Sequence, residues 1–200
     1  MSRPLIVAIT GASGPIYGIR ALELLRGVAD IETHLILSAG GRTTISYETD
    51  YAIDEVRALA DVVHSERNLA ASISSGSFRT AGMIVAPCSI KTLSGIALSH
   101  GDNLVARAAD VVLKERRPLV LMLRETPLHS GHVRLMQQAI ENGAIMMPPV
   151  PAFYERPRTI AEIVDQSVGR ALDQLGIDVG VVRRWQGPPA GIADEQPDGD

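Results

Sequence analysis

The stretch LIVAITGASGPIYG, residues 5–18, constrains the fold of this chain more than any other part of it. Its first six residues carry no charge and all but Thr10 are apolar, as is typical of a strand buried on both faces of a parallel sheet. Three glycines and Pro15 follow, and these residue types suit a tight turn into the start of a helix. Backbone N–H groups at a helix start can hold a phosphate, although a tight turn alone would explain the same residues.

The alternation of strand and helix patterns continues along the chain. Strands are predicted at residues 5–10, 32–37, 62–64, 83–86, 119–123 and 144–147, and helices at 16–28, 42–49, 54–60, 90–99, 103–116, 128–142 and 159–175. Pro87 is expected to close the fourth strand, and Ser89 to cap the helix that follows it. This alternation predicts an α/β fold, Rossmann-like or flavodoxin-like, with a parallel sheet and helices on both faces.

Length and composition limit the other possibilities. A chain of 200 residues that is 46% hydrophobic can bury one core, so we expect a single domain over residues 3–185 and a disordered acidic tail over 186–200. The net charge of −4 gives no electrostatic footprint for nucleic acid. The single cysteine, Cys88, is interpreted as a small buried residue rather than a nucleophile. Because no apolar run approaches the ~18 residues of a membrane span, we predict a soluble, cytoplasmic protein.

Polar residues follow four of the predicted strands. They are Gly11 to Ser13, Ser38, Ser89 to Thr92, and Arg124 with Glu125. The carboxyl ends of parallel strands meet at one edge of a sheet, so these residues predict a polar cleft for an organic phosphate. NAD is disfavoured because Ser38 stands where a dinucleotide-binding unit has an acidic residue. Residues 70–78, AASISSGSF, could either line such a site or form a flexible linker. His129 and His132 have no third ligand, so no metal site is expected.

Several long segments resemble one known family, the flavin prenyltransferases of the UbiX type. The matching segments are TGASGPIYGIR, SYETD, AASISSGSF, PCSIKTLSGIA, RAADVVLKERRPLVLMLRETPLH and MPPVPAFYERP, and together they extend over nearly all of residues 5–185. This family belongs to the wider group of homo-oligomeric flavin-containing Cys decarboxylase-like proteins. Pro15 stands where many members have alanine, and the first helical turn tolerates proline.

The resemblance implies an activity and a set of site residues. The enzyme would transfer a dimethylallyl group from dimethylallyl phosphate to N5 and C6 of reduced FMN, without a metal. The prenylated FMN would serve UbiD-type decarboxylases in ubiquinone synthesis or aromatic acid decarboxylation, and the enzyme would be a homo-oligomer, a dodecamer. By this similarity, FMN contacts Gly11, Ala12, Ser13, Ser38, Ser89, Ile90, Lys91, Thr92 and Arg124. The substrate phosphate contacts Ser75, Gly76, Lys114, Arg124, Tyr154 and Arg170, partly from neighbouring subunits.

The residue types suit that chemistry. Lys114, Arg124 and Arg170 would stabilise the departing phosphate. The resemblance gives proton-transfer roles to Ser13, Glu48 and Glu125, which together with Lys114 form the implied catalytic set.

Two other functions are alternatives to this one. One is a flavin-dependent decarboxylase of cysteine-derived carboxylates, whose catalytic histidine and Asn-containing run are replaced here by the regions of Tyr17 and Lys91. The other is an accessory protein that only stores or escorts flavin. It would not need Lys114, Glu125, Tyr154 and Arg170 together.

Overall fold

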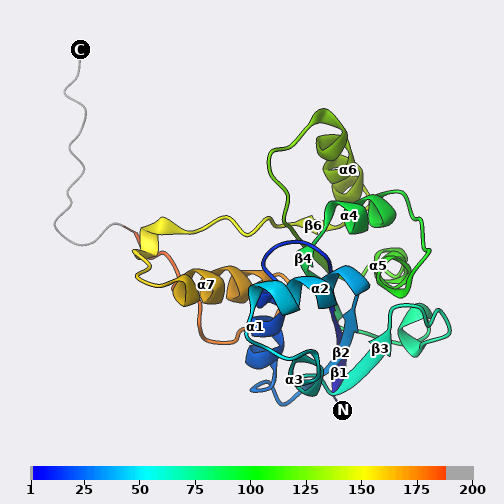
Figure 1. The fold of residues 1–200 in the computed structure, drawn as a ribbon, viewed down its shortest axis with the longest axis horizontal. Helices are drawn as coiled ribbons and strands as arrows, with labels where there is room; N and C mark the ends of the chain where they lie inside the picture. Colours follow the sequence, from blue (N-terminus) through cyan, green and yellow to red (C-terminus); the bar gives the residue numbers. More distant parts are fainter. Residues whose placement is uncertain (1, 188–200) are drawn as a thin grey trace.

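The computed structural model describes residues 2–187; residues 188–200, most of the predicted tail, lie outside them. Within the described residues, six strands form one parallel sheet with the order β3-β2-β1-β4-β5-β6 (Figure 1). The strands are β1 (Arg3–Ile9), β2 (Ile31–Leu37), β3 (Val62–Ser65), β4 (Gly82–Cys88), β5 (Leu119–Leu123) and β6 (Ile145–Met146). The order changes direction between β1 and β4, and open α/β sheets bind their ligands at such a switch point.

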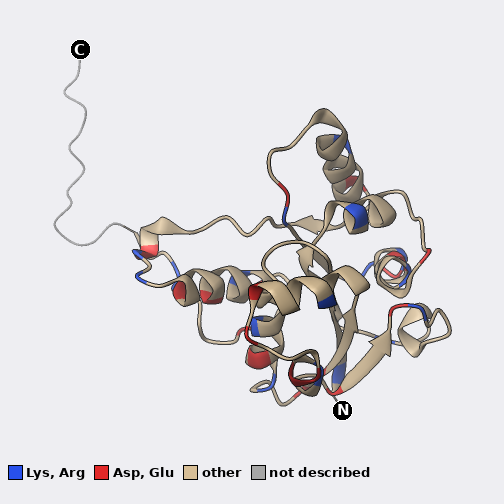
Figure 2. Cartoon of the chain, viewed as in Figure 1, with Lys and Arg blue, Asp and Glu red and all other residues tan. Residues whose placement is uncertain are grey.

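Helices cover both faces of the sheet, as predicted. They are α1 (Ile16–Leu25), α2 (Ala39–Glu48), α3 (Ile53–Ala58), α4 (Ile90–Ala97), α5 (Leu104–Lys114), α6 (Ser130–Glu141) and α7 (Ile160–Asp173). The odd-numbered residues of β1 pack with α1, α2, α3 and α7, whereas the even-numbered ones pack with α4, α5 and α6. Charged residues lie mainly on the helices and loops, and the strands contain few (Figure 2). Two apolar layers therefore enclose the sheet.

The predicted elements are confirmed, with shifted ends. The helix predicted at 42–49 begins at Ala39, because Ser38 Oγ accepts a hydrogen bond from Gly41 N and caps the helix three residues earlier. Ser89 caps α4 as expected.

The prediction that Pro87 closes its strand is wrong. β4 continues through Pro87 to Cys88, with an irregular register against β5. The Pro87 carbonyl accepts hydrogen bonds from Thr10 N and Thr10 Oγ1, at 3.3 and 2.7 Å, so the residue stays attached to the end of β1 although it has no N–H of its own. Cys88 is fully buried, and burial raises the pKa of its thiol to about 12, which fits the expected small core residue.

The chain leaves β6 in an extended connection that includes a 3₁₀ turn, Phe153–Glu155, and returns as α7. This connection carries the chain past the sheet to α1, against which α7 packs (Figure 1). Arg20 of α1 is paired with Asp165 of α7, with 2.6 Å between Nε and Oδ1. None of the helices within residues 2–187 has the length and apolarity needed to cross a bilayer.

Candidate functional site

The glycine turn after β1 brings two predicted catalytic residues together. Gly14 has a φ of +90°, which a residue with a side chain adopts only with strain. Its N–H donates to Glu48 Oε2 at 2.8 Å, and Ser13 Oγ lies 3.2 Å from the same oxygen. A Cβ on Gly11 would lie 2.8 Å from the Cα of Gly40, so the turn also needs glycine for its close contact with α2. The carboxylate of Glu48 thus holds the turn and is hydrogen-bonded to a hydroxyl.

A cleft of about 530 Å³ lies between the beginnings of α2 and α4. It is lined by five of the residues predicted to contact FMN, Gly11, Ser38, Ser89, Lys91 and Thr92, whereas Ala12, Ser13, Ile90 and Arg124 are not in its wall. Ser89 Oγ accepts from Thr92 N at 3.2 Å, and Lys91 is exposed in the same helical turn. N–H groups, hydroxyls and one ammonium therefore meet at the start of an eight-residue helix, which is chemistry that fits a phosphate.

Glu66 is a wall residue of this cleft that the sequence did not single out. Both of its carboxylate oxygens accept from Ala39 N, at 2.9 and 3.0 Å, and Arg42 Nη2 lies 3.4 Å away. The start of α2 already carries a carboxylate, so the start of α4 is the more favourable place for a phosphate.

Arg124 and Glu125 directly follow β5. Arg124 N donates to Cys88 O at 3.0 Å, which fixes this segment beside the end of β4. The charge of Arg124 also acts on Tyr17. Burial raises the pKa of Tyr17, and the positive charge of Arg124 opposes that rise. Glu125 is half-buried and accepts from Thr126 N at 3.1 Å.

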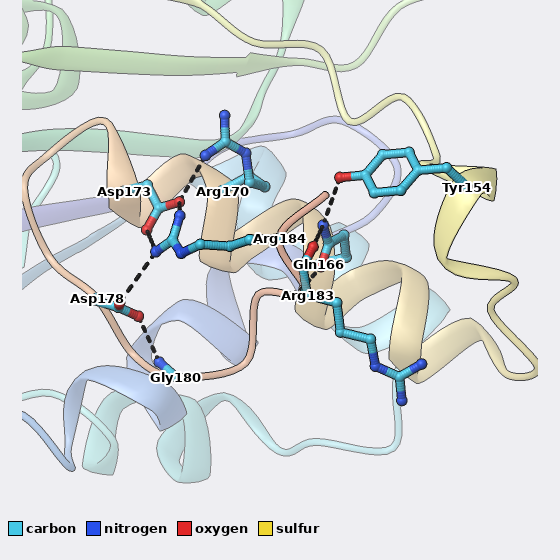
Figure 3. A network of polar contacts seen from close by, with 8 residues as sticks. All are labelled: Tyr154, Gln166, Arg170, Asp173, Asp178, Gly180, Arg183 and Arg184. Atoms are coloured by element: carbon cyan, nitrogen blue, oxygen red, sulfur yellow. Dashed lines mark hydrogen bonds and ion pairs between the residues drawn. The ribbon is translucent and has the colours of Figure 1, made fainter. Parts of the chain in front are cut away.

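Tyr154 and Arg170 share a smaller pocket of about 130 Å³, walled on one side by Met147 and Pro148. Figure 3 shows their surroundings at α7. Arg170 Nη1 lies 2.8 Å from Asp173 Oδ2, and the same carboxylate accepts two hydrogen bonds from Arg184, at 2.9 and 3.0 Å. The hydrogen bonds from these guanidinium groups hold the pKa of Asp173 below its usual value, and those from Arg184 have the larger effect.

Several residues of this network were missed by sequence reasoning. Gln166 is buried and bonds to Tyr154, Asp173 bonds to Arg170, and the ring of Trp185 packs edge-on against Tyr154 at 5.7 Å. The contact of Gln166 with Tyr154 depends on the path of the chain between them, so no local sequence pattern pointed to it.

The remaining predicted residues lie elsewhere in the chain. Ser75 and Gly76 adjoin the end of α5: a Cβ on Gly76 would lie 2.7 Å from Lys114 Nζ, and Arg117 donates to Gly76 O at 2.9 Å. Lys114 precedes β5 and Arg124 follows it, so a five-residue strand separates them, roughly 16 Å at ~3.3 Å per residue. One chain by itself does not bring all predicted phosphate ligands together. No group of three or more His, Cys, Asp or Glu residues within 2–187 is arranged to hold a metal ion.

Comparisons with known proteins agree with the fold. The flavoprotein family model matches residues 1–171. The flavin prenyltransferase UbiX of Escherichia coli K12 is 62% identical over 185 residues, which cover 92% of this chain and 98% of that protein.

Two crystal structures are also similar. One is a UbiX protein in complex with FMN and dimethylallyl pyrophosphate, at 51% identity and a TM-score of 0.91, covering 94% of this chain and 99% of that one. The other is a dodecameric FMN-dependent UbiX-like decarboxylase from E. coli O157:H7, at 52% identity and a TM-score of 0.90, covering 92% of this chain and all of that one. On these matches, the chain belongs to the flavoprotein family and, within it, to the flavin prenyltransferases of the UbiX type.

Proposed function

We propose that this protein transfers the dimethylallyl group of dimethylallyl phosphate to N5 and C6 of reduced FMN, and that the prenylated FMN is passed to a UbiD-type decarboxylase in the cytoplasm. The observation that carries the proposal is the coincidence of the α4 cleft with most of the predicted FMN contacts, in a chain 62% identical to a flavin prenyltransferase. The solved relative with FMN and dimethylallyl pyrophosphate supports the pairing of these two ligands.

FMN fits the cleft through its phosphate. The phosphate would be held by the N–H groups at the start of α4, the hydroxyls of Ser89 and Thr92 and the ammonium of Lys91. At the start of α2, the Glu66 carboxylate would repel a phosphate. When bound, the reduced flavin supplies the nucleophilic ring atoms.

The cationic residues would act on the prenyl donor. Cleavage of its allylic C–O bond leaves the electron pair on the phosphate, so Arg124 and Arg170 would stabilise the departing anion and Tyr154 would donate a hydrogen bond to it. Lys114 would come from a neighbouring subunit, because β5 separates it from Arg124 within one chain. The dodecameric relative supports a homo-oligomer, and the interfaces of a closed oligomer bring residues of neighbouring subunits together.

Glu48 and Ser13 would serve in proton transfer. Bonds from N5 and C6 to the prenyl group would release a proton from each of these two ring atoms, and the prenyl double bond would take one proton up. A carboxylate hydrogen-bonded to a hydroxyl can accept and return such protons. Glu125 is the second carboxylate proposed for this task.

The first test is anaerobic incubation with reduced FMN and dimethylallyl phosphate, followed by mass spectrometry of the released flavin. A flavin heavier by one five-carbon unit is expected, and a parallel incubation with the diphosphate compares the two donors. Lys114→Ala should keep FMN bound and lose product, whereas Arg26→Ala, which removes an exposed charge at the far end of α1, should retain activity. Bound FMN that stays unmodified would instead favour the accessory-flavoprotein function.

A mixing experiment tests the shared site. Glu48→Gln and Lys114→Ala should each be inactive, but co-expressed chains should form sites with both residues intact, about a quarter of the total for random assembly. Mixed oligomers without activity would contradict the contribution of Lys114 from a neighbour.

A further inference from the structure

Gln166 makes three hydrogen bonds in the interior of the protein. It lies on α7 and is 8% exposed. Its Oε1 accepts from Arg183 N at 3.0 Å, and its Nε2 donates to Arg183 O and to the Tyr154 hydroxyl, both at 3.2 Å (Figure 3). One amide side chain thus joins α7, the connection after β6 and the segment that follows α7.

The direction of these bonds is fixed by the backbone. A peptide N–H can only donate and a peptide carbonyl can only accept. The N–H of Arg183 therefore requires Oε1 on its side, and the carbonyl of Arg183 requires Nε2 on the other. Because Nε2 has no acceptor capacity, the hydroxyl of Tyr154 must receive the proton of this bond on its oxygen.

This direction determines what the hydroxyl of Tyr154 can do. Its oxygen already accepts a hydrogen bond, so its own proton is free for a different partner. The tyrosine ring is half-exposed and shares the 130 Å³ pocket with Arg170. We infer that Gln166 is a positioning residue that keeps the phenolic proton of Tyr154 available to the substrate phosphate, an inference that rests on the proposed function.

The variant Gln166→Glu tests the direction of the bond. It has nearly the same shape and keeps an oxygen for Arg183 N, but the atom that faces both Tyr154 and the carbonyl of Arg183 becomes a carboxylate oxygen, so the bond to that carbonyl is lost as well. The phenol then donates to this oxygen rather than to the phosphate. We expect KM for dimethylallyl phosphate to rise about 10- to 100-fold, the usual effect of losing one hydrogen bond to a charged group, while the affinity for FMN stays within about twofold of wild type.

Three comparisons separate positioning from general damage. Tyr154→Phe should raise KM by a similar factor, and the double variant should be no worse than Tyr154→Phe alone, because both changes remove the same hydrogen bond. Relative to wild type, the defect of Gln166→Glu should shrink as the pH falls and the introduced carboxyl takes up a proton, since it can then donate.

The results that overturn the inference are distinct from those that overturn the function. If wild type forms prenylated FMN and Tyr154→Phe raises KM but Gln166→Glu does not, the positioning role is refuted and the proposed function stands. If wild type forms no product, the proposed function itself fails. If Gln166→Glu does not fold, Gln166→Met replaces it, because methionine has a similar length and leaves the phenol without its donor. If the increase in KM of the double variant Gln166→Met/Tyr154→Phe equals the product of the two single increases, the inference is refuted.

Discussion

Thr10 connects the end of β1 to the turn that begins α4, and its removal is the sharpest test of how the fold holds the cleft. Thr10 is 1% exposed. Its hydroxyl donates to Pro87 O at 2.7 Å and accepts from Ser89 N at 2.8 Å. The variant Thr10→Val keeps the shape of the side chain and removes both bonds.

The expected cost follows from what each partner has left. Pro87 O keeps a weaker bond from Thr10 N at 3.3 Å, whereas the N–H of Ser89 loses the partner that Thr10 provides. An unpaired donor costs about 1–3 kcal/mol, and the weakened acceptor adds about 0.5–1 kcal/mol, so we expect about 1.5–4 kcal/mol less free energy of unfolding. For a chain of this size that corresponds to a fall in Tm of roughly 3–16 °C. Because Ser89 is the cap of α4, FMN should also bind more weakly.

The assay is urea unfolding and thermal melting at fixed protein and FMN concentrations, with flavin fluorescence for binding. Thr10→Ser is the matched control: it keeps both hydrogen bonds and loses one methyl group, about 1 kcal/mol. If Thr10→Val proves more stable than Thr10→Ser, or binds FMN as tightly as wild type, the reasoning from the two bonds is refuted.

Three further outcomes are expected. The buried Cys88 thiol, with its pKa raised to about 12, should resist alkylation at pH 8 until denaturant is added, as followed by intact mass; rapid labelling of the folded protein would contradict this. Burial and the nearby His34 lower the pKa of His64, so the unfolded chain binds more protons below about pH 6.5 and the free energy of unfolding should fall there as the pH falls. In urea titrations, His64→Asn should reduce this slope, and an unchanged slope would assign it to other groups. Gly11→Val should push the turn from Gly40 and weaken FMN binding at least tenfold by fluorescence titration, because even a Cβ would lie 2.8 Å from the facing Cα; wild-type affinity would contradict the close contact.

Local sequence patterns predicted the elements correctly because apolar residues are continuous along the central strands and periodic along the helices. Uncharged apolar runs predicted the β1 and β5 strands, and Ser89 predicted the helix cap after β4. The end of β4 was wrong because it depended on a contact with a distant part of the chain: Pro87 stays in β4 because its carbonyl bonds to Thr10, 77 residues earlier.

The sequence by itself determined the α/β class, the polar strand ends and the resemblance to flavin prenyltransferases, since each depends on residue type and spacing. Only the tertiary structure decided which of these residues meet. Ser13 and Glu48 are 35 residues apart, and Gln166 contacts Tyr154 only because the connection after β6 turns back along α7. The separation of Lys114 from Arg124 likewise follows from their places at opposite ends of β5. Spacing along a chain predicts the elements, but the order of the strands and the paths of the loops set the distances between side chains.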